Sequence, residues 1–290
     1  MIRIINTNLR KGVFYGLCSG FFFGLMAFIV SLGKNSVPSS QLVFFRGLSN
    51  VILLFWFVRN LLPQIFENGA LWLWSRGILG STALLCFYFN LQNTTPGTAK
   101  SLHFIGPVVL VILSWVILKE RLNLKELCAI FITFLGTALI LLPKSLRPEP
   151  SVIIIGLLGA LMGGSALLCL RKATSLFCSK LIVWWMSLMM IVTSLFVPDR
   201  SWVLPDFKGW LIIVGVSASG LLQQLVMTLS FKYLRAAIAI NLALTSMAWV
   251  ITFGIIFDGV SPSPLEWLAY LFILLGAMGV NVFHNKQPST

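Results

Sequence analysis

Residues 13–32 read VFYGLCSGFFFGLMAFIVSL, a stretch without a single charged side chain. A helix needs about 20 mainly apolar residues to cross the roughly 30 Å of hydrocarbon in a bilayer, and this stretch is long enough. It is also longer than the core of a usual secretory signal and lacks a convincing small-residue cleavage site, although Arg3, Arg10 and Lys11 precede it. We therefore expect a retained first membrane-spanning helix.

Similar apolar runs follow along the whole chain, separated by short connections rich in proline. Only 10% of the 290 residues are charged and 58% are hydrophobic, whereas a soluble domain carries about 25% charged residues. The runs predict an all-α integral membrane protein with ten transmembrane helices. The expected spans are residues 12–32, 40–58, 70–90, 98–118, 124–142, 152–171, 180–197, 208–231, 236–257 and 263–284.

The formal net charge of +13 does not indicate nucleic-acid binding, because Lys and Arg flank the apolar runs and do not form one stripe. If both termini are cytoplasmic, about two thirds of the Lys and Arg residues fall on that side, which the positive-inside rule favours. Arg59 and Arg76 are among them, while the loop from Lys144 to Arg147 opposes the trend. We expect a multi-pass protein of the cell membrane, in bacteria the inner membrane.

The chain resembles itself when it is shifted by 138 positions. The shift pairs Trp72 with Trp210, Gly77 with Gly215, Ser81 with Ser219 and Glu120 with Asp258, and a two-residue insertion then pairs Glu126 with Glu266. We predict two five-helix repeats, residues 1–148 and 149–290. Because five is odd, the repeats insert with opposite topology around a central cavity, which favours alternating access.

Several short motifs fall at defined places in the first half. They are ArgGlyIleLeuGly at 76–80, ThrThrProGlyThrAla at 94–99, GlyPro at 106–107 and LysGluArgLeu at 119–122. Together they resemble the EamA family of the drug/metabolite transporter superfamily. In the second half AspGlyVal at 258–260 and Thr245 depart from the repeated pattern. The resemblance implies that four helices of each repeat enclose the cavity and that the fifth and tenth helices pack outside it. It also implies transport of compounds such as amino acids, nucleobase-like compounds, vitamins or S-adenosylmethionine.

Polar side chains at membrane depth usually face the interior of a helix bundle or a cavity. Lys100 and His103 share one face of the fourth helix with Pro107, and Asn241 and Thr245 lie on the equivalent face of the ninth. Arg46 and Asn50 lie four residues apart on the second helix, and Gln223 lies on the eighth. The predicted substrate-binding residues are Arg46, Asn50, Lys100, His103, Trp115, Gln223, Asn241, Thr245 and Trp249.

Each of these residues also has an ordinary structural interpretation. Lys100 can snorkel to the interface, His103 can be a satisfied interior histidine, and Asn241 can bridge two helices. Trp115 and Trp249 can pack against lipid or neighbouring helices instead of stacking on a ring-bearing substrate. Sequence alone leaves these alternatives open.

All eight carboxylates lie in loops or near helix ends. The lack of an acid near the membrane centre disfavours proton-coupled export of cations. It favours a neutral, zwitterionic or anion-bearing substrate, moved by exchange, by facilitated flow or by a coupling centred on His103. We therefore expect a secondary transporter, independent of ATP, that carries a small polar metabolite by alternating access. An amino acid and S-adenosylmethionine are two examples of such a metabolite.

Other classes of protein fit the sequence less well. A passive channel or facilitator has the same hydropathy and is the main alternative. A membrane enzyme is disfavoured, because His103 and His284 lie far apart and no HisGluXaaXaaHis segment occurs. The five cysteines have no disulfide or metal spacing. We expect no catalytic residue, no metal and no cofactor, with the substrate and the lipid bilayer as partners. A homodimer is one possible assembly.

Overall fold

The computed structural model is all-α over the residues that it describes, which are 2–34, 36–94, 99, 102–103, 105–119, 124–141, 149–197, 202–258 and four residue pairs between 264 and 276. The helices are α1 (Ile2–Leu32), α2 (Ser39–Val58), α3 (Ala70–Asn93), α5 (Ile105–Ile117), α6 (Leu124–Leu141), α7 (Pro150–Ala173), α8 (Ser179–Leu195), α9 (Phe207–Tyr233), α10 (Ala236–Ala243) and α11 (Ser246–Asp258). A 3-10 segment, η1 (Arg59–Phe66), follows α2.

Six stretches of the described chain are long and apolar enough to cross a membrane. They are Asn8–Leu32, Ser39–Phe66, Ala70–Asn93, Pro150–Ala173, Phe207–Tyr233 and Ala236–Phe257. Shorter apolar helices cover Ile105–Ile117, Leu127–Gly136 and Ser179–Leu195. The prediction of an all-α integral membrane protein is therefore confirmed, whereas the number of ten spans stays a prediction.

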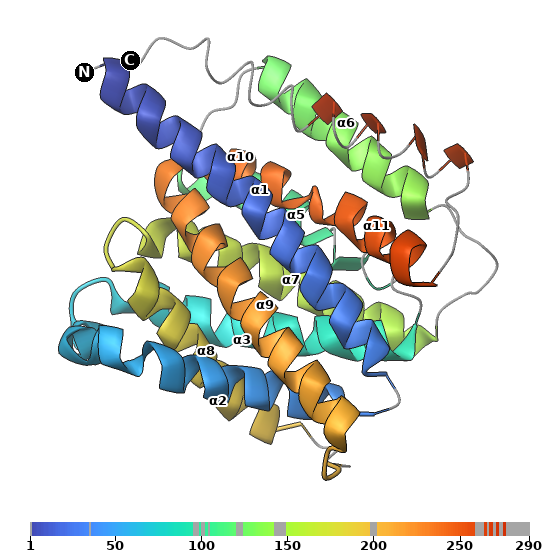
Figure 1. Cartoon of the computed structure of the whole chain (residues 1–290). Coiled ribbons are helices and arrows are strands. Elements are labelled where there is room, and N and C mark those ends of the chain that lie inside the picture. The colour runs from blue at the N-terminus through green and yellow to red at the C-terminus, as the bar shows by residue number, and fades with distance from the viewer. Residues whose placement is uncertain are drawn as a thin grey trace.

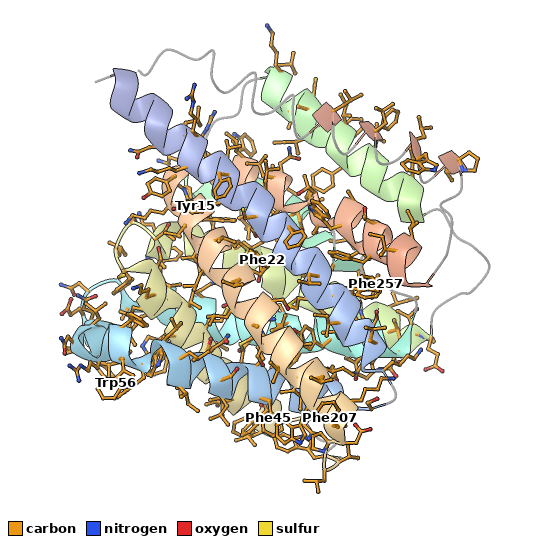
Figure 2. All side chains as sticks on the ribbon, in the orientation of Figure 1. Tyr15, Phe22, Phe45, Trp56, Phe207 and Phe257 are labelled. Atoms are coloured by element: carbon orange, nitrogen blue, oxygen red, sulfur yellow. The ribbon has the colours of Figure 1, made fainter. Side chains whose placement is uncertain are left out.

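Large apolar side chains cover the outside of the bundle. Trp56, Phe57, Phe131 and Phe257 are all well exposed, and Figure 2 shows that Trp56 and Phe257 lie far apart on the molecule. A soluble protein seldom exposes so large an apolar surface. In a bilayer these side chains meet lipid, so their exposure carries no hydrophobic cost.

The helices pair across the two halves of the chain. The closest packing joins α1 to α9 and α3 to α7, and α2 packs along α8. In Figure 1, α1 runs beside α9, whereas α6 lies at the edge of the bundle. Glycines at every fourth residue of α1 allow close approach, as in other membrane helices. A β-carbon at Gly16 would meet Leu242, and one at Gly24 would meet Trp249.

The expected ninth helix is interrupted. Sequence predicts one helix over residues 236–257, but α10 ends at Ala243 and α11 begins at Ser246. The amide N–H of Leu244 donates to the carbonyl of Ile240 at 3.0 Å, while that of Thr245 donates three residues back, to Leu242, at 3.2 Å. This tightening makes a turn within the span without a proline. Hydropathy gives no sign of it, because the residues on both sides are equally apolar.

Candidate functional site

A central cavity lies between helices from both halves of the chain. It contains about 850 Å³ of space free of protein atoms, part of it open to the outside. Its walls come from α1, α2, α3, α5, α7, α8, α9, α10 and the start of α11. Its polar lining residues are Arg46, Arg76, His103, Gln223, Gln224 and Ser246.

Arg46 projects from α2 and is completely buried. Its Nη1 donates to the hydroxyl of Tyr88 at 2.8 Å and contacts the sulfur of Met26 at 2.9 Å. Its Nη2 donates to the carbonyl of Gly220, on α9, at 3.0 Å. The Nε of Arg46 is buried without a hydrogen-bond partner. Three helices thus hold the guanidinium in place, and one of its donors is unused.

Arg76 projects from α3 into the same cavity and is only 4% exposed. A β-carbon at Gly80, one turn later, would collide with Nη1 of Arg76. Glycine at position 80 therefore makes the room that the guanidinium occupies. The Nε of Arg76 is also buried without a hydrogen-bond partner. The assignment of Arg76 to a membrane-flanking position is wrong, because its side chain lies inside the bundle.

Two glutamines of α9 bring further hydrogen-bond donors to the cavity. The amide nitrogen of Gln223 lies 3.3 Å from the sulfur of Met227, and that of Gln224 lies 2.9 Å from the sulfur of Met186. A thioether is a weak acceptor. These amides are therefore paired with partners that a substrate oxygen can readily replace.

His103 lies on the cavity wall among aromatic rings. Its ring centroid is 4.5 Å from that of Phe87 and 5.7 Å from that of Phe23. The imidazole is half-buried and faces the cavity. This arrangement offers an aromatic surface beside the charged and amide groups.

Three of the other polar residues predicted from sequence lie between helices and do not line the cavity. The amide nitrogen of Asn50 lies 3.4 Å from the hydroxyl of Ser187, and that of Asn241 lies 3.5 Å from the carbonyl of Gly276. Thr245 is buried at the turn between α10 and α11. Here the bridging interpretation describes the contacts of both asparagines.

The two predicted tryptophans face away from the cavity. Trp115 is 66% exposed on the outside of α5. Trp249 is partly exposed and packs edge-on against Phe21 of α1, with ring centroids 4.9 Å apart. Lys100 lies outside the described residues. Of the predicted site, the structure brings Arg46, His103 and Gln223 together in the lining of one cavity.

Sequence reasoning missed Arg76 and Gln224. Arg76 lies six residues into α3, close enough to the helix start to resemble an interfacial charge. The signal that marks it is Gly80, one turn later, because a glycine there leaves space for a long side chain. Gln224 is adjacent to Gln223, and helical geometry sends neighbours in different directions, so the two together did not suggest one site.

Comparisons with known proteins agree with this architecture. Residues 10–142 match the EamA-like transporter family. The pseudopaline exporter of Pseudomonas aeruginosa is 22% identical over 79% of this chain and 81% of its own length. A transporter of Helicobacter pylori is 25% identical over 87% of this chain and 88% of its own length, and the transporter YwfM of Bacillus subtilis is 23% identical over 96% and 97%.

A crystal structure also shares the fold. It superposes with a TM-score of 0.75 at 16% sequence identity and covers 94% of this chain and 98% of its own. At that identity the likeness concerns the fold alone. The relatives are named as transporters, which points to a membrane transporter and away from an enzyme. Through the match over residues 10–142, a little under half of its length, this membrane-spanning chain is similar to the EamA-like transporter family.

Proposed function

We propose that this protein is a secondary transporter that carries a small polar, anion-bearing metabolite through the central cavity by alternating access. The observation that carries the proposal is the pair of buried guanidinium groups, Arg46 and Arg76, which line one cavity that has no Asp or Glu among its described lining residues. Buried charges are costly unless they are paired. An anionic solute would provide the missing partner.

The packing of the helices supports two inverted repeats, residues 1–148 and 149–290. In this arrangement α1, α2 and α3 correspond to α7, α8 and α9. The contact of α1 with α9 is matched by that of α7 with α3, and α2 contacts its own equivalent, α8. Reciprocal pairing of this kind is what a twofold axis between equivalent units produces. Ten spans follow if residues 98–118 and 263–284 complete the two halves.

Residues that the repeat relates to each other line the cavity from both halves of the chain. The shift of 138 residues relates Pro107 to Thr245 and Gly106 to Leu244. Gly106 and Pro107 line the cavity from the first half, and Leu244 and Ser246 line it from the second. In the second half the turn between α10 and α11 interrupts a helix, and in the first half Pro107 lies near the start of α5; interrupted helices are typical of binding sites in secondary transporters. They support a cavity that opens alternately to the two sides.

The relatives support export or exchange as the mode of transport. One of them is named as an exporter of pseudopaline, and the present substrate belongs to the broader class of zwitterionic or anion-bearing metabolites, amino acids and S-adenosylmethionine among them. Exchange is favoured because the empty cavity keeps two buried guanidinium groups without a carboxylate among its described lining residues. An empty carrier would then reorient more slowly than a loaded one. The membrane is the bacterial inner membrane, with both termini cytoplasmic.

Counterflow into liposomes tests the proposal. The purified protein is reconstituted, the liposomes are preloaded with one unlabelled compound, and uptake of its labelled form is measured for amino acids, nucleosides, vitamins, organic acids and S-adenosylmethionine. A carrier gives saturable uptake that depends on preloading, and Arg46→Ala reduces it. Flux that is neither saturable nor stimulated by preloading would establish the alternative, a passive channel. Robust transport of lipophilic cations that Arg46→Ala leaves unchanged would exclude an anion site.

A further inference from the structure

Among the residues that the structure describes, the lining of the cavity has two more positive than negative side chains. Arg46 and Arg76 both line it, and its described lining residues have no carboxylate to oppose them. Both side chains are almost completely buried, so water cannot screen their charges as it does at a surface. A solute with a single negative charge would leave one guanidinium uncompensated. A solute with two would neutralise both.

The hydrogen-bond inventory of the cavity points the same way. The Nε donors of Arg46 and Arg76 have no acceptor, and the amides of Gln223 and Gln224 are paired with methionine sulfurs. The described lining therefore offers several donors to a solute, together with one buried acceptor that has no partner, the Oε1 of Gln224. A guanidinium binds a carboxylate or phosphate most strongly when two N–H groups point at two oxygens. The Nε–H of Arg76 can take part in such a pair, whereas the Nε of Arg46 faces Gly220 and the charge of Arg46 acts on the solute electrostatically.

We propose that the transported metabolite is a dianion, either a dicarboxylate or a phosphate monoester, and that Arg46 and Arg76 both pair with its negative charge. The proposal rests on the proposed transport function and specifies its substrate class. Arg46 is fixed by Tyr88 and Gly220 and provides the rigid part of the site. Arg76, which has only glycine at the next turn of its helix, can adjust to the length of the solute.

Counterflow with matched solutes tests the charge of the substrate. Labelled glutarate and glycerol 3-phosphate represent the two kinds of dianion, butyrate represents a monocarboxylate, and alanine represents a zwitterion. We expect at least one dianion to give saturable counterflow about tenfold above butyrate and alanine. The thermal unfolding temperature of the purified protein should also rise with that dianion, compared with sodium chloride at equal ionic strength.

Three variants separate the role of each charge. In Arg76→Gln, the preference for the dianion over butyrate should fall about tenfold, because one guanidinium remains. In Arg46→Lys, the preference for the dianion should persist, because the positive charge remains. The half-saturation concentration should rise, because the paired N–H donors of the guanidinium are lost. Arg59→Gln removes the same charge from the exposed segment η1 and should change neither quantity. Circular dichroism checks that each variant is folded.

The possible failures are distinguishable. Counterflow of alanine or butyrate without any dianion would overturn the dianion proposal and leave the transport function standing. Dianion counterflow with an unchanged preference in Arg76→Gln would also overturn it. If no solute shows counterflow and no dianion raises the unfolding temperature, both the transport function and the dianion proposal fail. Counterflow of glutarate alone or of glycerol 3-phosphate alone supports the proposal and identifies which dianion is the substrate.

Discussion

The guanidinium of Arg46 lies directly against the α-carbon of Gly220, in the space that a side chain at position 220 would need. The contact joins α2 of the first half to α9 of the second. It also places the Gly220 carbonyl within 3.0 Å of Nη2. The position of the arginine therefore depends on a residue that is 174 positions away in the sequence.

Gly220→Ala should displace Arg46. A β-carbon would overlap Nε of the arginine, and overpacking of this kind costs about 1–3 kcal/mol. We expect transport in liposomes to fall about tenfold, since 1.4 kcal/mol corresponds to a factor of ten. Val214→Ala, at an exposed position of the same helix, is the control and should transport normally. Normal transport by Gly220→Ala would show that Arg46 has no fixed role.

Tyr88→Phe should loosen Arg46 without changing the shape of the site. The substitution removes the hydroxyl that accepts from Nη1 at 2.8 Å, and a hydrogen bond to a charged group contributes about 1.5–3 kcal/mol. We expect a lower unfolding temperature in detergent and weaker substrate affinity, with the maximal rate less affected. Tyr15→Phe removes the same atom from a half-buried ring of α1 and provides the comparison. Equal unfolding temperatures in the two variants would contradict the expectation.

Cysteines placed in the cavity should report its charge. Ala243 lines the cavity, and Ala243→Cys in a background without Cys18, Cys86, Cys128, Cys169 and Cys178 should react with water-soluble methanethiosulfonates. After correction for the rates with a free thiol in solution, the sulfonate-bearing reagent should react about tenfold faster than the ammonium-bearing one, because the arginines concentrate anions.

The outward position of Trp115 supplies the control for this labelling. Trp115→Cys would face lipid, so neither reagent should modify it at a comparable rate. Fast labelling of Trp115→Cys that the substrate prevents would restore Trp115 to the binding site. A preference of Ala243→Cys for the ammonium reagent would contradict a cationic cavity.

Pro107→Ala should slow the carrier more than it weakens binding. Proline lacks the N–H that would bond to the preceding turn, and alanine can restore that bond and stiffen the wall of the cavity. Conformational steps limit the rate of many such proteins. We expect the maximal counterflow rate to fall about fivefold at a nearly unchanged half-saturation concentration. Pro63→Ala, in the exposed segment η1, should have no effect, and a faster Pro107→Ala carrier would refute the expectation.

Hydropathy was sufficient to predict the helical membrane architecture. The bounds of α2, α3 and α9 fall close to the expected spans 40–58, 70–90 and 208–231, because lipid imposes a minimum length on each apolar run. The turn at Leu244 was not predictable in this way, since its neighbours are as apolar as those of an unbroken helix. The equivalence of the next residue, Thr245, to Pro107 was the available clue.

The candidate site was only partly predictable. Helical spacing relates residues on one helix, but it does not tell which polar face meets the cavity and which meets another helix. Arg46 and Asn50 illustrate the limit, because they lie one turn apart and yet only Arg46 lines the cavity. Arg76 was misassigned because a charged residue near the start of a helix can lie either at the membrane interface or inside the bundle. Only the packing around Gly80 distinguishes them.

Both cavity arginines belong to the first half of the chain. The positions related to them by the repeat hold Trp184 and Val214, which have no charge. In a perfectly symmetric inverted repeat, the outward-facing and inward-facing states would be equal in energy, and the substrate would be bound equally well from either side. Here the first half supplies both arginines, and the second half supplies uncharged lining residues, Gln223 and Gln224 among them. The proposed carrier should therefore rest preferentially facing one side and show different half-saturation concentrations on its two faces, while the solute gradients alone set the direction of net flow.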